Sequence, residues 1–134
     1  MNRMAALRQY RNVNTQSEMV DASPHRLIQL LMEGGLSRIA QARGCMERGE
    51  LAQKGVLLSK AQNILAGLRD GLDFEKGEAL AVNYAQLYDY MTRRLVEANR
   101  VNSVEMLDEV SGLLLTVKMG WDAIDPANAA PAAP

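Results

Sequence analysis

The sequence predicts an all-α protein, an antiparallel up-down four-helix bundle, and three observations favour this fold. Four successive segments carry apolar residues at every third or fourth position, which is the spacing of amphipathic helices. Short stretches with Gly, Asp, Asn or Ser separate these segments, and short links make consecutive helices antiparallel neighbours. Aromatic residues supply only 4% of the chain, so the core must be built from aliphatic residues and Met, of which Leu, Met and Ala are good helix formers.

The length of 134 residues is typical of one domain. We expect the four-helix bundle at residues 23–122, with an N-terminal arm or short helix at residues 1–22. Residues 123–134 are rich in Ala and Pro and can bury little apolar surface, so we expect them to form a mobile tail.

The first two helices have clear boundaries in the sequence. Ser23 is a favoured capping residue and Pro24 suits the first helical position, so the first helix is expected to start there. Gly49 is expected to end it. The second helix is expected from about Leu51 to Leu72, because its apolar stripe recurs through that range.

The last two helices are expected after a short polar link, residues 73–77. The third is predicted from Glu78 to about Ala98, with Leu80 and Tyr84 beginning its apolar stripe. Asn102 followed by Glu105 predicts a capping box at the start of the fourth. The stripe of the fourth helix repeats at intervals of three and four, through Leu107, Val110, Leu114, Val117 and Trp121.

The overall composition argues against nucleic acid and membrane as partners. The chain has 15 basic and 16 acidic residues, whereas nucleic-acid binders usually gather a basic excess on one face. No apolar run approaches the roughly 20 residues that a membrane-spanning helix needs. Cys45 is the only cysteine, which excludes an internal disulfide and fits a reducing compartment. We therefore expect a cytoplasmic protein with no nucleic-acid partner and no membrane insertion.

The residue inventory also predicts no enzyme, no metal site and no cofactor. His25 is the only histidine, so zinc sites, di-iron bundles and Ser-His-Asp arrangements lack ligands or partners. A phosphotransfer bundle also uses a single histidine, but there it lies in the middle of a helix. His25 falls at a helix start, and we interpret it as an exposed first-turn residue.

Glycines and wide apolar faces suggest a helical partner without proving one. Each glycine inside a helix costs about 1 kcal/mol relative to Ala. Such glycines either let the four helices approach closely or leave shallow surface grooves for another helix. Some apolar helix faces are also wide, and a wide face either fills a larger core or meets a partner. The residues that widen them are Leu57-Leu58, Ile64-Leu65 and Leu113–Leu115. Eight glycines fall within the helical patterns: Gly34, Gly35, Gly44, Gly55, Gly67, Gly71, Gly112 and Gly120.

Ordered motifs from Tyr10 to Trp121 resemble those of the FliS family of flagellar export chaperones. The motifs are Asp21-Ala22-Ser23-Pro24, Leu27-Ile28 through Gly34-Gly35, Lys60-Ala61 through Leu72-Asp73, Leu87-Tyr88-Asp89-Tyr90-Met91 through Ala98-Asn99, and Leu107-x-Glu109-Val110. The chain departs from the family pattern at Asp21, where Thr is usual, at Met32-Glu33, where Tyr-Asp is usual, and at Gly35, where Ala is usual.

The resemblance implies a specific function. Members of this family bind the disordered C-terminal segment of flagellin in the cytoplasm, prevent its premature polymerisation and deliver it to the flagellar type III export apparatus. The segment folds into helices as it wraps the bundle, which is coupled folding and binding. The family's N-terminal arm can occupy part of the groove, which implies that role for Met4, Leu7 and Tyr10.

The predicted flagellin-binding residues lie in the arm and on the apolar stripes of the second, third and fourth helices. Groove and core residues of these stripes share one pattern, so the sequence does not separate them. The set is Tyr10, Leu57, Ile64, Leu65, Leu68, Tyr88, Met91, Leu95, Leu107, Val110 and Leu114. The alternative is a self-associating helical-bundle structural or adaptor protein in flagellar regulation, and we expect a monomer or a weak dimer.

Overall fold

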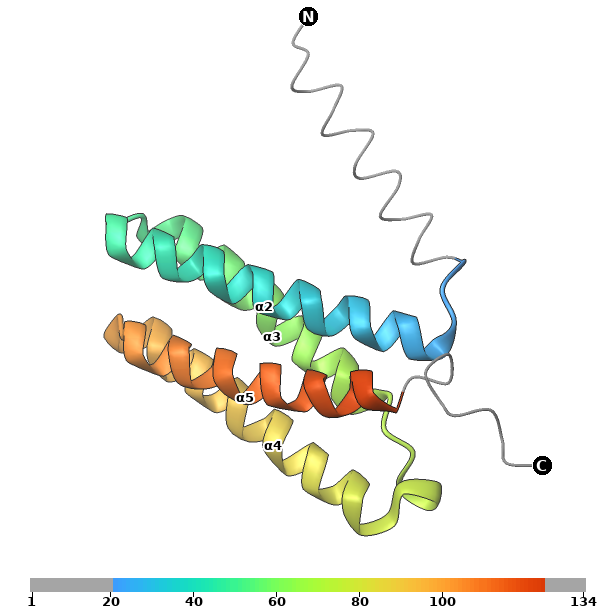
Figure 1. Ribbon diagram of the computed structural model, residues 1–134. Coiled ribbons are helices and arrows are strands. Elements are labelled where there is room, and N and C mark those ends of the chain that lie inside the picture. Colours follow the sequence, from blue (N-terminus) through green and yellow to red (C-terminus); the bar gives the residue numbers. More distant parts are fainter. Residues whose placement is uncertain (1–20, 125–134) are drawn as a thin grey trace, which may run out of the picture.

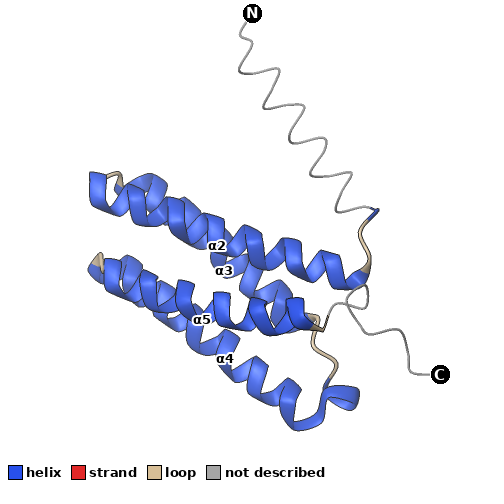
Figure 2. Ribbon diagram, viewed as in Figure 1, coloured by secondary structure: helices blue, strands red, loops and turns tan. Residues whose placement is uncertain are grey.

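The computed structural model describes residues 21–124 and confirms the all-α four-helix prediction for them. The helices are α2 (Pro24–Arg48), α3 (Leu51–Asp70), α4 (Phe74–Val101) and α5 (Val104–Ala123). Figure 2 shows only helices and connecting loops over this part of the chain.

The four helices form two hairpins that pack side by side. Helix α2 packs against α3 and α5, and α4 packs against the same two helices. Two or three residues link consecutive helices, so each helix runs antiparallel to the one before it. Because the chain runs along the bundle four times, the start of α2 and the end of α5 lie at the same end of it (Figure 1).

The ends of α2 lie where the sequence predicts them. The Ser23 hydroxyl accepts a hydrogen bond from the Arg26 backbone N–H at 3.1 Å, and Pro24 is the first helical residue. Gly49 adopts a left-handed conformation with φ of 74°, and its N–H donates to the carbonyl of Met46. Only glycine adopts this conformation without a steric penalty, so Gly49 ends the helix cleanly.

The predicted capping box at Asn102 is wrong by one residue. Asn102 ends α4 in the left-handed conformation, with φ of 58°. Ser103 caps α5 instead, because its hydroxyl accepts a hydrogen bond from the Met106 N–H at 3.2 Å. The two helices are separated by only these two residues, so each residue serves one helix.

The polar link predicted at residues 73–77 is wrong for residues 74–77, which form the first turn of α4, while Asp73 lies in the link. The Asp73 carboxylate accepts hydrogen bonds from the N–H groups of Glu75 and Lys76 and so caps this turn. Glu78, the predicted helix start, is the one non-helical residue inside α4, with φ of 49° and ψ of −126°. Glycine favours this region, and for Glu it costs about 1–3 kcal/mol.

The kink at Glu78 follows from the lengths of the helices. Helix α4 has 28 residues and α3 has 20, so a straight α4 would extend roughly 12 Å further than α3. The three residues between Asp70 and Phe74 must also cross to the neighbouring helix axis, about 8–10 Å away. A straight α4 is too long for this link, and the kink lets the chain turn back.

The core occupies the space between the four helices. It contains residues from every helix, and the apolar stripes predicted from the sequence supply most of it. Gly35 permits close packing here, because a Cβ at Gly35 would lie 3.1 Å from Leu114 of α5 and 3.5 Å from Ile64 of α3. For Gly35, close approach of the helices is the correct interpretation, whereas a Cβ at Gly34 would make only an ordinary contact, 3.4 Å from Ile64.

Lys54 is a charged residue within this packing. Its ammonium donates hydrogen bonds to the Asn99 carbonyl at 3.1 Å and to the Asn102 side-chain oxygen at 3.0 Å. Both acceptors lie at the C-terminal end of α4, where the helix dipole favours a positive charge. Lys54 therefore holds the start of α3 against the end of α4.

Polar contacts on the surface fix how neighbouring helices are rotated. Arg69 of α3 donates to Asp89 of α4 at 2.8 Å. Glu109 of α5 accepts from the Tyr90 hydroxyl at 2.8 Å and from Arg94 at 2.6 Å, both on α4. These two donors, Tyr90 first, lower the pKa of Glu109. Solvent screens exposed pairs of this kind, so they specify packing more than they contribute to stability.

The strain at Glu78 gives a testable prediction. We expect Glu78→Gly to raise the free energy of unfolding by about 1 kcal/mol, because relief of strain exceeds the added flexibility of the unfolded chain. Urea unfolding measures this. Gly77→Ala is the matched control and should destabilise the protein, because its Cβ would lie 2.8 Å from that of Ala81. A destabilised Glu78→Gly variant would show that the kink carries no strain.

Candidate functional site

An apolar pocket of about 100 Å³ opens at the end of the bundle where α2 and α4 begin and α3 and α5 end. All four helices contribute to its wall. Apolar cavities of this order bind small hydrocarbon groups, so the pocket suits one apolar side chain of a partner. Its lining is Ile28, Met32, Leu68, Gly71, Leu72, Tyr84, Tyr88, Val117 and Trp121.

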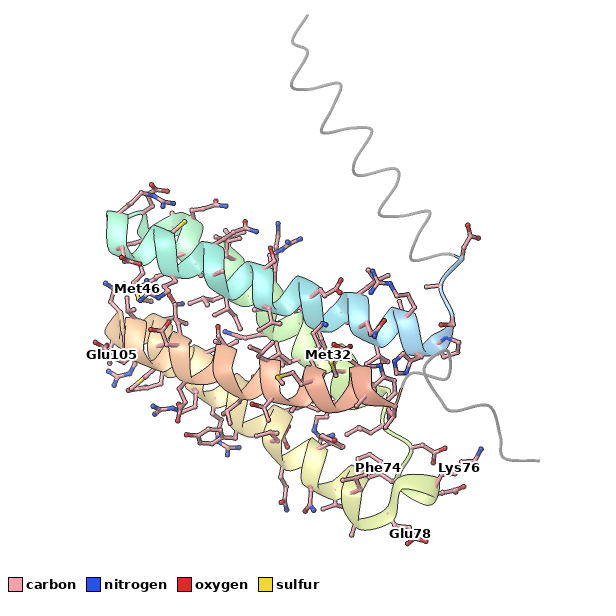
Figure 3. All side chains as sticks on the ribbon, viewed as in Figure 1. Met32, Met46, Phe74, Lys76, Glu78 and Glu105 are labelled. Atoms are coloured by element: carbon pink, nitrogen blue, oxygen red, sulfur yellow. The ribbon has the colours of Figure 1, made fainter. Side chains whose placement is uncertain are left out.

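The pocket exists because α4 diverges from its neighbours at this end. Figure 1 shows α4 running away from α5 towards its own N-terminus, and Figure 3 places Phe74 and Glu78 there, at the opposite end from Met46. The apolar stripe of α4 continues into this part through Tyr84 and Leu80. Leu80 is 61% exposed, so the stripe extends further than the bundle covers.

Trp121 forms one side of the pocket and ties α5 to α2. Its indole stacks on the His25 ring with centroids 4.6 Å apart, and its Nε1 donates to the His25 carbonyl at 3.0 Å. Beside it, Asp122 accepts from Lys118 and from Gln29, and these contacts, Lys118 first, lower the pKa of Asp122. The last turn of α5 is thus fixed to the first turns of α2.

The predicted exposure of His25 is also wrong. It lies in the first turn of α2 as predicted, but only 8% of its surface is exposed. The cause is the last turn of α5, which lies over it through Trp121. The apolar periodicity of α2 does not reveal this contact, because it comes from a residue 96 positions later in the chain.

Tyr88 forms the deep wall of the pocket on α4. It is buried, and its ring stacks on that of Tyr84 with centroids 6.3 Å apart. Burial raises the pKa of the Tyr88 hydroxyl to about 12, because the phenolate would lose its hydration.

The predicted binding residues fall into distinct places. Leu68 and Tyr88 line the pocket. Ile64 is half-buried beside the glycines of α2, and Tyr10 lies outside the described residues. Seven others are at most 4% exposed in the core: Leu57, Leu65, Met91, Leu95, Leu107, Val110 and Leu114. Contact of any of these residues with a partner stays a prediction.

Sequence reasoning missed most of the pocket lining. Periodicity identifies the buried face of a helix but not the position of a residue along the bundle. Four residues of the lining therefore lie on predicted stripes without having been predicted as site residues: Ile28, Leu72, Tyr84 and Trp121. The length mismatch becomes visible only in the structure, where α4 has 28 residues and α3 and α5 have 20 each, because the sequence predicts helices of similar length.

The outer face of α5 is a second apolar surface. Leu115 is 49% and Met119 is 64% exposed, one turn apart. A Cβ at Gly112 or Gly120 would meet nothing within 4 Å, so these glycines are not required for packing inside the bundle. Every exposed residue from Gly112 to Ala123 is uncharged. This face fits the alternative interpretation of the glycines, a surface on which another helix can lie.

Within residues 21–124 the side chains offer no group of three His, Cys, Asp or Glu residues placed to hold a metal ion. The helices of this part of the chain are also too short or too polar to cross a bilayer.

Comparison with known proteins agrees with these features. Residues 6–128 match the family model described as "Flagellar protein FliS". The chain is 56% identical to the Flagellar secretion chaperone FliSB of Pseudomonas aeruginosa, over 92% of this chain and 98% of the relative. It is 43% identical to the Flagellar secretion chaperone FliS of Salmonella typhimurium, over 91% of each chain. The relative of the same name from Bacillus subtilis is 35% identical, over 79% of this chain and 78% of its own length.

The raised pKa of Tyr88 predicts a specific loss of stability in alkali. Stability from the buried, protonated hydroxyl is complete below pH 10 and is lost as the pH rises towards about 12, because only the unfolded chain releases this proton readily. Urea unfolding from pH 9 to 11.5 measures the loss. Tyr88→Phe should lose less stability over this range, and parallel losses in the two proteins would contradict the assignment.

Proposed function

Because the chain belongs to the FliS family, we propose that it is a cytoplasmic secretion chaperone that binds the C-terminal segment of flagellin, and that it is not an enzyme. Its relatives bear the name flagellar secretion chaperone. By holding the segment it prevents premature polymerisation and delivers flagellin to the flagellar type III export apparatus. The observation that carries the proposal is the apolar pocket at the open end of the bundle.

The pocket supports recognition of an amphipathic helix. Such a helix places one apolar anchor in a pocket and lays its remaining apolar face along the neighbouring groove. The exposed stripe beyond Tyr84 and the uncharged outer face of α5 provide further apolar surface. A disordered segment that folds on these surfaces gains burial that it lacks when free, and this offsets the entropy of ordering.

The predicted binding residues take two roles in this proposal. Leu68 and Tyr88 contact the anchor directly, because they line the pocket. The seven core residues hold the helices that form its walls, and Ile64 and Tyr10 extend the surface. Leu68 and Tyr88 are themselves buried, so substitutions there should lower both affinity and stability, whereas substitutions of the seven should act mainly through stability.

A second candidate function is self-association through the outer face of α5. The exposure of Leu115 and Met119 favours it, because large exposed apolar side chains side by side often mark an interface. Sedimentation equilibrium over a concentration series distinguishes the two candidates. A chain that remains monomeric excludes self-association and leaves the chaperone proposal intact.

Titration with the flagellin segment tests the proposal. We expect one segment to bind per chain with micromolar or tighter affinity, a negative heat-capacity change and a gain of helix. Calorimetry at several temperatures and circular dichroism measure these quantities. Absence of binding at micromolar concentrations would overturn the proposed function.

Three alanine variants separate the pocket from the core. Tyr84→Ala should weaken binding of the segment at least tenfold with a small change in stability, because it removes a half-buried wall of the pocket. Leu95→Ala should lose about 2–5 kcal/mol of stability, because it leaves a cavity in the core. Leu51→Ala, exposed at the opposite end, should change neither. Equal affinity for the Tyr84→Ala variant and the unmodified chain would place the binding site elsewhere.

A further inference from the structure

His25 carries a polar atom that the described residues leave without a partner. Its Nε2 is buried, with less than 1 Å² of accessible surface, and none of residues 21–124 forms a hydrogen bond with it. More than nine-tenths of buried polar groups in native proteins have such a partner. An unpaired buried nitrogen therefore needs an explanation.

The imidazole lies next to the apolar pocket. His25, Ile28 and Met32 follow one another at intervals of three and four, so they share one face of α2. Ile28 and Met32 line the pocket. Trp121 connects the two places, because the same indole lines the pocket and lies flat on the His25 ring.

The polar groups nearest to His25 are already used. Trp121 donates its only N–H to the His25 carbonyl. Asp122 accepts from Lys118 and from Gln29. None of these hydrogen bonds involves Nε2, so a ligand can supply the partner that residues 21–124 do not.

We propose that His25 is a specificity-determining residue, whose Nε2 forms a hydrogen bond with a side-chain amide or hydroxyl of the bound flagellin segment. This inference rests on the proposed function. A neutral imidazole nitrogen either accepts or donates, depending on its tautomer, and Asn, Gln, Ser and Thr side chains do both. The segment thus presents one of these residues next to the apolar anchor that enters the pocket.

The contact requires the side chains around His25 to move. Nε2 has almost no accessible surface in the free chain, so a partner group reaches it only after its surroundings shift, and Trp121 is one of them because it lies on the His25 ring. Trp121 is the only tryptophan in the sequence, and its fluorescence therefore reports this movement without a label. Binding of the segment should change the emission of the unmodified protein.

Two substitutions of His25 test the hydrogen bond. His25→Phe keeps an aromatic ring against Trp121 but has no nitrogen. We expect the melting temperature of the free protein to stay constant or rise, because an unpaired polar atom is removed from the interior. Affinity for the segment should fall about tenfold, because the segment's polar group is buried without a partner. His25→Gln offers an amide close to the original position and should recover most of the affinity.

A double-mutant cycle identifies the partner residue. Each Asn, Gln, Ser and Thr of the segment is replaced by Ala in turn, and every peptide is titrated against the unmodified chain and against His25→Phe. We expect one replacement to cost about tenfold with the unmodified chain and almost nothing with His25→Phe. The other replacements should cost the same with both proteins.

The outcomes separate the inference from the function on which it rests. If the unmodified chain does not bind the segment, the proposed function fails. If it binds and His25→Phe binds equally well, only the role of His25 fails. If His25→Phe lowers the melting temperature and the affinity together, and no peptide position is coupled to it, His25 is a packing residue and the inference is wrong.

Discussion

The difference in length between α4 and its neighbours determines much of this structure. Helix α4 has 28 residues, whereas α3 and α5 each have 20, and only three residues join α3 to α4. The chain meets this constraint with the kink at Glu78 and with the divergence of α4 from α5. Because α4 diverges, its apolar stripe is left partly uncovered, and the pocket forms where four matched helices would have closed the core.

The sequence predicts those parts of the fold that depend on local chemistry. Ser23, Pro24 and Gly49 each have a conformational preference that fixes one end of α2, and the structure places them as expected. The apolar stripes predict the core for the same reason, because a helix must bury its apolar face. The link at Asn102 and Ser103 is ambiguous locally, since both residues are good caps, and the choice depends on where α4 ends.

The candidate site is less predictable because it depends on distances along the bundle. Leu68 and Leu65 belong to the same stripe and both are buried, yet only Leu68 lines the pocket. The difference is position, because Leu68 lies nearer to the end of α3. His25 shows the same limit, because its burial comes from Trp121, far away in the sequence.

The proposed function depends on the part of the bundle that the four helices leave open. The pocket and the outer face of α5 are apolar, and the surface ion pairs hold the helices around them. In the proposed function, membership of the FliS family suggests flagellin as the ligand, and the pocket is the proposed means of holding it. Methyl NMR on the chain with the flagellin segment added tests this account most directly. It predicts the largest shifts at Ile28, Leu72 and Val117. Shifts confined to the opposite end, at Leu51 and Val56, with these three methyl groups unchanged, would contradict it.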